Sequence, residues 1–197
     1  MSTKLLYFLL GLGLGLCSWW VTDRVLAYRF NAHYENQMAR YDTQGFLDEE
    51  PQLDVEKLLD LALTDARTGT STTIRAASDK VLFVNLWATW CNPCILEMPS
   101  IARLKELRGD STAFFLISNE EPDRVREFAT NDDSPLPFYH YDLDGSGLET
   151  IAGQAIPRTF IIYNARVILD HVGSAPWDSE KVLAIIDGLL ASEPEKQ

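Results

Sequence analysis

Runs of apolar residues alternate along this chain with segments in which apolar residues recur at helical spacing. Short runs rich in β-branched and aromatic residues predict strands at 71–76, 81–87, 112–118, 137–142, 158–164 and 166–173. The helical pattern predicts helices at 92–108, 121–131, 147–153 and 178–191. Strands interleaved with helices favour an α/β fold with a central mixed sheet flanked by helices. The last two strands are expected to form a hairpin through Asn164 and Ala165.

A further helical pattern precedes the first of these strands. Val55, Leu58, Leu59, Ala62 and Leu63 recur at i, i+3, i+4, i+7 and i+8, which predicts a helix that packs on the domain. The acidic segment 48–50 and the proline after it interrupt any regular pattern just upstream. Residues 55–197 are therefore interpreted as one domain with an N-terminal helix, preceded by a juxtamembrane tether at 23–54.

The N-terminus has the pattern of a membrane segment. Residues 5–21 are uncharged and leucine-rich, at the short end of the roughly 17 to 25 residues that a spanning helix needs. A cleaved signal peptide is the alternative, but Asp23 and Arg24 would then lie between the apolar core and a cut after Ala27. This placement favours an uncleaved transmembrane signal anchor at 1–22. Its orientation cannot be assigned from charge, because Lys4 and the terminal amine on one side balance Arg24 and Arg29 on the other.

Composition and charge limit the classes of partner that the chain is expected to bind. The chain has 197 residues, 46% of them hydrophobic, which is enough for one core. Its formal net charge is −12. Nucleic-acid binding depends on basic contacts to phosphate, so a surface this acidic argues against a nucleic-acid partner.

The motif Cys91-Asn92-Pro93-Cys94 directly follows the apolar run 81–86. Both thiols are thus expected at the end of a strand and at the start of a helix, where free N–H groups and the helix dipole favour a thiolate. Zinc normally needs four ligands, but apart from Cys17 the chain has no further cysteine, and its three histidines are widely scattered. A purely structural Cys91–Cys94 bridge would close a very small loop and stabilise little. Redox chemistry is the better use of this spacing.

Two segments together carry a family resemblance. The first is Asn85-Leu86-Trp87-Ala88-Thr89-Trp90-Cys91-Asn92-Pro93-Cys94 with Glu97 and Pro99, and the second is Ile156-Pro157-Arg158-Thr159-Phe160. Over roughly residues 70 to 192 the chain resembles the thioredoxin superfamily, and within it the membrane-anchored TlpA/ResA-like thiol-disulfide oxidoreductases. The resemblance implies a thioredoxin-like fold, in which 137–153 would be the extra αβ insertion of that branch.

The resemblance also implies the parts of the site. Cys91 would attack a substrate disulfide, and Cys94 would then resolve the mixed disulfide. Asn85 stands where cytoplasmic thioredoxins have a buried acid, so we nominate Glu97, one helical turn after Cys94, to handle the proton. The alternative is that Glu97 is an ordinary solvated glutamate.

The second segment is expected to bind substrate. The resemblance implies a cis Ile156–Pro157 bond facing the cysteines, with Trp90, Ile156 and Pro157 as substrate-binding residues. An ordinary trans proline at a sheet edge is the alternative. Arg158 would either bias the charge of the substrate or simply be exposed.

Anchored members of this family hold the domain outside the cytoplasm. The chain is therefore expected to be a single-pass protein of a bacterial inner membrane, with its thioredoxin domain in the periplasm. The resemblance implies protein disulfide substrates, among them apocytochrome c or metal-site assembly proteins, and a DsbD/CcdA-type membrane electron donor. No cofactor is expected beyond the Cys91–Cys94 disulfide, and no metal.

Two other functions stay open. The same fold could serve a disulfide oxidant or isomerase, which a less negative reduction potential would distinguish. A copper-handling protein of the same fold could use Cys91, Cys94 and either Met98 or one of the distant histidines, His140 and His171. The sequence identifies neither the substrate nor the oligomeric state.

Overall fold

The computed structural model describes residues 53–132, 135–141 and 155–191. The chain divides into the units Met1–Tyr41 and Asp42–Gln197, and all described residues belong to the second. The expected anchor, nearly all of the tether and the helix at 147–153 lie outside these ranges. Within them, no helix combines the length and apolar character needed to cross a bilayer.

The described strands form one seven-stranded sheet. Its order is β2 (Ser71–Thr73), β1 (Ala62–Asp65), β5 (Phe138–His140), β4 (Thr112–Ser118), β3 (Val81–Leu86), β6 (Arg158–Tyr163) and β7 (Arg166–Val172). β3, β4 and β5 run parallel, whereas the other pairs are antiparallel. The expected mixed sheet is therefore confirmed, with β3 between a parallel and an antiparallel neighbour.

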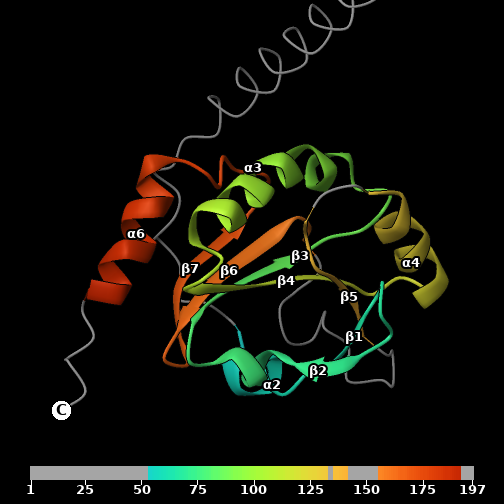
Figure 1. The fold of residues 1–197 in the computed structure, drawn as a ribbon, viewed down its shortest axis with the longest axis horizontal. Helices are drawn as coiled ribbons and strands as arrows, with labels where there is room; N and C mark the ends of the chain where they lie inside the picture. The colour runs from blue at the N-terminus through green and yellow to red at the C-terminus, as the bar shows by residue number, and fades with distance from the viewer. Residues whose placement is uncertain (1–52, 133–134, 142–154, 192–197) are drawn as a thin grey trace, which may run out of the picture. The chain divides into compact units, whose positions relative to one another are not determined.

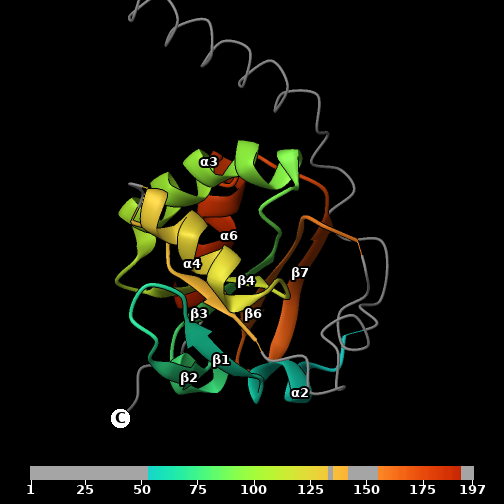
Figure 2. The same cartoon turned by 90° about the vertical axis from the view of Figure 1, so that its right-hand side faces the viewer.

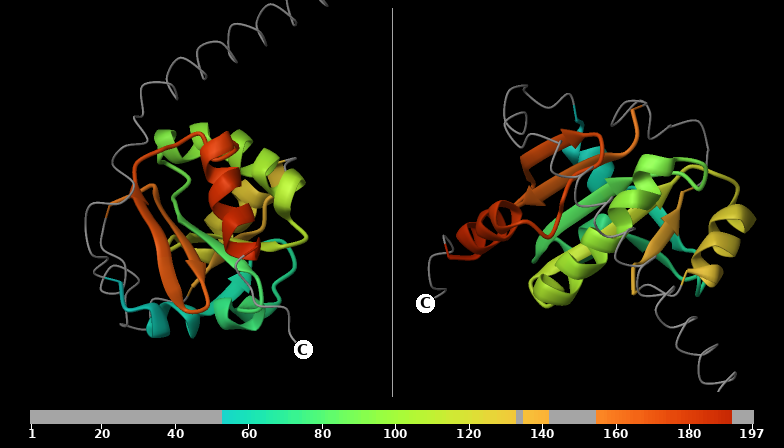
Figure 3. Two further views of the ribbon diagram at one scale, coloured as in Figure 1. Left: turned by 90° about the vertical axis from the view of Figure 1, so that its left-hand side faces the viewer. Right: turned by 90° about the horizontal axis from the view of Figure 1, so that it is seen from above.

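Helices cover both faces of this sheet (Figures 1 and 2). On one face lie α3 (Asn92–Arg108), α4 (Pro122–Asn131) and α6 (Glu180–Ala191), whose buried side chains share a core cluster with Phe83 of β3. On the other lie α2 (Val55–Leu59) and the short 3₁₀ helix η2 (Ile74–Ala77), which share a second cluster with Val84. Figure 3 shows the sheet between these two layers from the side and from above. All six residues of β3 are buried because side chains that alternate along it fill both cores.

The element bounds agree closely with the sequence pattern from residue 81 onward. The predicted helix 92–108 and strand 112–118 match α3 and β4 residue for residue, and the other described helices and strands from 81 to 191 differ by at most two residues at an end. The hairpin is confirmed, since β6 and β7 are joined by Asn164 and Ala165, both with positive φ. Positive φ at both central residues is the requirement of a two-residue type I′ turn.

The predicted helix over residues 55–63 is wrong beyond Leu59. The helix ends at Asp60, whose backbone N–H bonds to the carbonyl oxygen of Glu56, and the chain continues as β1. β1 pairs with β2 on one side and β5 on the other, so its backbone bonds depend on partners that the local pattern does not reveal. The predicted strand 71–76 is likewise only β2, followed by η2.

Candidate active site

The two cysteines lie at the junction between β3 and α3. β3 ends at Leu86, and Cys91 is the N-cap of α3, with Pro93 in the first turn where a missing N–H costs no hydrogen bond. The Cys91 and Cys94 sulfurs are bonded at 2.02 Å, and Cys91 Sγ also accepts the N–H of Cys94 at 3.3 Å. The sequence motif thus places both sulfurs at the helix N-terminus, as expected.

The disulfide is mostly covered. Cys91 is 4% exposed and Cys94 is 1% exposed, so Cys91 is only slightly more accessible than Cys94. Trp90, directly before Cys91, is 67% exposed and presents its ring to solvent. Exposed aromatic residues are common at protein interfaces, which is compatible with the expected role of Trp90 in binding substrate.

Glu97 is fully buried, so the alternative of a solvated helical glutamate is wrong. One carboxylate oxygen accepts from Asn85 Nδ2 at 2.8 Å, and the other accepts from Trp177 Nε1 at 2.8 Å and from the backbone N–H of Ala175 at 3.2 Å. Burial away from water raises the pKa of Glu97 to about 7, while the hydrogen bonds from Trp177, Asn85 and Ala175 oppose that rise. A carboxyl group with this pKa can accept or release a proton near neutral pH.

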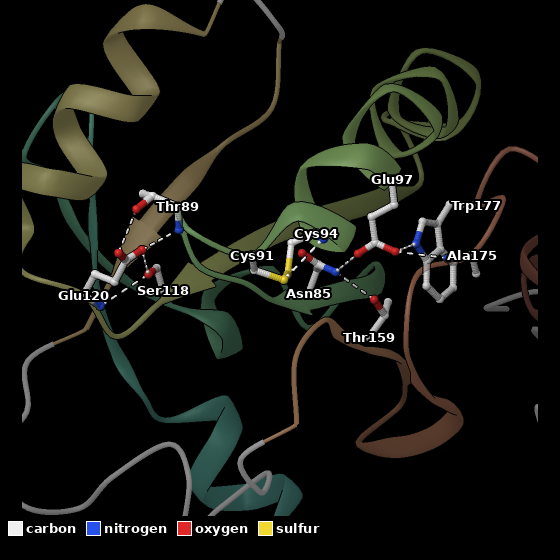
Figure 4. Close-up of a disulfide and its surroundings, with 10 residues drawn as sticks. All are labelled: Asn85, Thr89, Cys91, Cys94, Glu97, Ser118, Glu120, Thr159, Ala175 and Trp177. Carbon is white, nitrogen blue, oxygen red and sulfur yellow. Dashed lines mark hydrogen bonds between the residues drawn. A yellow bond between two sulfur atoms is a disulfide. The ribbon is translucent and has the colours of Figure 1, made fainter. Parts of the chain in front are cut away.

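Asn85 connects β3 to β6 beneath the helix that carries the cysteines. It lies opposite Thr159 in the antiparallel pairing of the two strands, and its amide nitrogen donates to Thr159 Oγ1 at 2.9 Å. The same nitrogen donates to Glu97, so the amide is oriented by two acceptors. In Figure 4, Asn85 lies between the disulfide and the Glu97 carboxylate.

A second carboxylate, Glu120, lies on the opposite side of the disulfide (Figure 4). It follows the end of β4 and accepts from the backbone N–H of Thr89 at 2.6 Å, from Thr89 Oγ1 at 2.8 Å and from Ser118 Oγ at 3.1 Å. Thr89 is two residues before Cys91, in the loop between β3 and α3. Glu120 therefore holds in place the segment that leads to Trp90 and Cys91.

The proline segment lies at the same end of the sheet. The Ile156–Pro157 bond is cis, as expected, and Pro157 is buried. Arg158 lies opposite Leu86 in the pairing of β6 with β3, which brings residues 156–157 to the end of β3 from which the cysteine loop starts. Ile156 is partly buried and packs against both cores.

The expectation that Arg158 is simply exposed is wrong. Its guanidinium group makes a bidentate ion pair with Asp170 of β7, at 2.8 and 2.6 Å, and both side chains are about 15% exposed. Its charge is therefore paired within the β6–β7 hairpin, and its side chain is not exposed on the surface.

Sequence reasoning missed Trp177, Thr159 and Glu120 as parts of the site. Each meets its partner only through the fold, at sequence separations of 80, 74 and 31 residues. One signal was available for Trp177, because a buried indole N–H needs an acceptor. In the described residues, no group of three or more His, Cys, Asp or Glu side chains is placed to hold a metal ion.

Comparison with known proteins identifies a matching family and several relatives of this chain. The family model described as Redoxin matches residues 54–185. The chain is 31% identical to the thioredoxin-like protein YneN of Bacillus subtilis, over 54% of this chain and 65% of that protein. It is also 31% identical to the thiol:disulfide interchange protein HelX of Rhodobacter capsulatus, over 57% of this chain and 62% of that protein. The chain thus spans slightly less than two thirds of both relatives.

Solved structures share the fold. The exposed lipoprotein thioredoxin Etrx1 of Streptococcus pneumoniae superposes with a TM-score of 0.56 at 21% sequence identity, over 66% of this chain and 99% of that one. At this identity the likeness supports the fold alone.

Proposed function

Because the chain belongs to the redoxin family, we propose that it is a thiol-disulfide oxidoreductase that reduces disulfides in other proteins. One observation carries the proposal: the Cys91–Cys94 disulfide caps a helix, one turn from a buried carboxyl group whose pKa is about 7. A structural disulfide has no need of a proton acceptor. The name of the relative HelX, a thiol:disulfide interchange protein, supports the same reaction class.

The reaction proceeds in two exchanges. In the reduced protein the Cys91 thiolate attacks one sulfur of a substrate disulfide, which forms a mixed disulfide and releases the other substrate sulfur as a thiolate. The Cys94 thiolate then attacks Cys91 Sγ, which forms the intramolecular disulfide and releases the second substrate thiolate. Two electrons pass from the protein dithiol to the substrate.

Glu97 serves the second exchange. Cys94 must lose its proton before it attacks, and the Glu97 side chain lies one helical turn further along α3. Asn85 cannot accept that proton, because its amide nitrogen is a donor and is already directed at Glu97 and Thr159. Trp90, Ile156 and Pro157 would contact the substrate, with the segment before β6 pairing to an extended peptide.

The cellular setting of the reaction is part of the proposal. We place the domain on the extracytoplasmic side of a bacterial inner membrane, held by the anchor at 1–22. The oxidised protein would then regain two electrons from a DsbD/CcdA-type membrane donor. Apocytochrome c and metal-site assembly proteins are the substrates to test first.

The first test is the reduction potential of the Cys91–Cys94 pair in the full-length chain, equilibrated with a thiol-disulfide buffer. We expect a value near about −270 mV, as for thioredoxin, whereas a value near about −120 mV would indicate an oxidant. If the two cysteines formed no intramolecular disulfide, the protein could be neither a reductase nor an oxidant of this kind. That result would favour the copper-handling alternative.

The order of attack is tested with single cysteine variants. C94S should accumulate a stable mixed disulfide with a peptide disulfide substrate, because Cys91 attacks and no thiol resolves the product. C91S is the matched control and should trap far less. Mass spectrometry of the trapped species measures both. Equal trapping by the two variants would overturn the assignment of Cys91 as the nucleophile.

A further inference from the structure

The Glu97 carboxylate is held by groups from distant parts of the chain. Asn85 of β3 donates to one oxygen, and the segment between β7 and α6 supplies both donors to the other, the indole N–H of Trp177 and the backbone N–H of Ala175. Two of the three hydrogen bonds measure 2.8 Å. The orientation of this carboxylate is therefore set largely by a segment about 80 residues away in sequence.

Trp177 is itself fixed in place. It is fully buried, and its ring packs edge-on against Phe83 at a centroid distance of 5.2 Å and against His171 at 5.7 Å. Its backbone N–H donates at 3.2 Å to Ser100 Oγ, one turn beyond Glu97 on α3. The indole N–H is thus directed at the carboxylate by packing on both sides, and the same segment is bonded to the helix that carries the cysteines.

We propose that Trp177 is a positioning residue for thiol exchange, whose indole N–H holds the Glu97 carboxylate in place and favours its ionised form. This inference rests on the proposed function, in which Glu97 accepts the Cys94 proton. The alternative is that Trp177 only fills the core. Phenylalanine separates the two roles, since it keeps most of the ring packing and removes the N–H.

The direction of the effect follows from hydrogen bonding. A donor to a carboxylate stabilises the charged form, so losing the indole N–H should raise the pKa of Glu97 above its value of about 7. Less of Glu97 would then be ionised at neutral pH. The elements around this carboxylate carry other titratable or charged groups. Nearest in the sequence or in the pairing are Cys91, Cys94, His171 and the pairs Arg103–Asp178 and Arg158–Asp170, and further along α3 and β7 are Lys105, Glu106, Arg108 and Arg166.

The test measures the second exchange as a function of pH in the full-length protein. Oxidised glutathione is the probe: attack by Cys91 releases one glutathione, and resolution by Cys94 releases the second. For W177F we expect the midpoint of the resolution rate to move to higher pH by about one unit, the effect of losing one hydrogen bond to a charged group. At pH values well above the midpoint, the resolution rate of W177F should remain near that of the wild type.

Trp87 provides a matched control. It is also buried, four residues before Cys91, but its indole nitrogen has no hydrogen-bond partner among the described residues. W87F removes the same atoms without taking a donor from Glu97, so the midpoint should stay in place. In the E97Q background, W177F should likewise cause no shift. Equal shifts in W177F and W87F, or an unchanged midpoint in W177F where E97Q does change the pH profile, would overturn the proposal.

A direct titration separates this inference from the proposed function. The ¹³C chemical shift of the Glu97 carboxyl group reports its pKa whether or not Glu97 accepts a proton from Cys94. A higher carboxyl pKa in W177F would support the role of Trp177 even if E97Q left the pH profile of exchange unchanged, in which case the role of Glu97 in the proposed function would have failed. The same carboxyl pKa in W177F and wild type would overturn the inference.

Discussion

Glu97 couples the proposed chemistry to the stability of the protein. Its pKa is about 7 in the folded protein, compared with an ordinary value of 4.5. The folded protein therefore holds a proton on this side chain at pH values where the unfolded chain has released it. Stabilisation from that proton is fully present below about pH 4.5 and is lost as the pH rises through the folded value.

We predict that the contribution of Glu97 to the free energy of unfolding falls by about 3 kcal/mol between pH 4.5 and pH 7.5. This order-of-magnitude value follows from about 1.36 kcal/mol per pKa unit. E97Q should lack this component. Denaturant unfolding of both proteins at several pH values, with the disulfide intact, gives the difference in slope. Parallel pH profiles for the two proteins would show that Glu97 titrates at its ordinary pKa.

The residues of the site differ in how far the sequence could reveal them. Cys91, Cys94 and Glu97 lie in one short segment, so their spacing on a helix follows from the sequence alone. Trp177 and Thr159 come from the C-terminal part of the chain, and only the register of β6 on β3 and the packing of the segment after β7 bring them to the site. Contacts of this kind leave no local pattern in the sequence.

At the scale of elements, the loop between β3 and α3 is held by the side chain of Glu120, which follows the end of β4. Glu120 accepts both the backbone N–H and the hydroxyl of Thr89, and its side chain is 10% exposed. Removing this acceptor would leave polar groups of the loop unpaired in a largely covered position, which costs about 1–3 kcal/mol.

We predict that E120A lowers the free energy of unfolding by about 1–3 kcal/mol and slows attack by Cys91 on a peptide disulfide. E120Q should recover much of both, because its amide oxygen can still accept the Thr89 N–H. Equilibrium unfolding and the rate of mixed-disulfide formation measure the two effects. If E120A matched the wild type in both, Glu120 would have no role in fixing the loop.

The element predictions failed where pairing with distant strands overrides the local pattern. α3 was predictable because a proline in its first turn marks its start locally. The apolar spacing of residues 55–63 resembles a helix, yet Ala62–Asp65 form a strand because β2 and β5 supply hydrogen-bond partners on both of its edges. Sequence periodicity contains no information about those partners.

At the scale of the described domain, two cores lie on opposite faces of one sheet. Leu58 of α2 belongs to one core and Ile101 of α3 to the other, and both are fully buried. β3 contributes side chains to each core, so the two are joined through the central strand. Loss of packing on either face should therefore weaken the whole domain.

We predict that L58A and I101A each lower the free energy of unfolding by about 2–5 kcal/mol, with a single transition and an unchanged denaturant slope. Near-ultraviolet circular dichroism and protection of a reduced Cys94 thiol from alkylation should report the same midpoint. A loss below about 1 kcal/mol for L58A would mean that α2 lies outside the cooperative unit.

The long sequence separation between Glu97 and Trp177 has a consequence for synthesis of the protein. The ribosome completes the cysteine motif and Glu97 about 80 residues before it reaches Trp177. Until the segment between β7 and α6 has been synthesised and has packed against α3, the Glu97 carboxylate lacks two of its three hydrogen-bond donors. A nascent chain thus carries its thiols well before the hydrogen bonds to Glu97 are complete, and the exchange chemistry proposed for this site would begin only when the segment after β7 is in place.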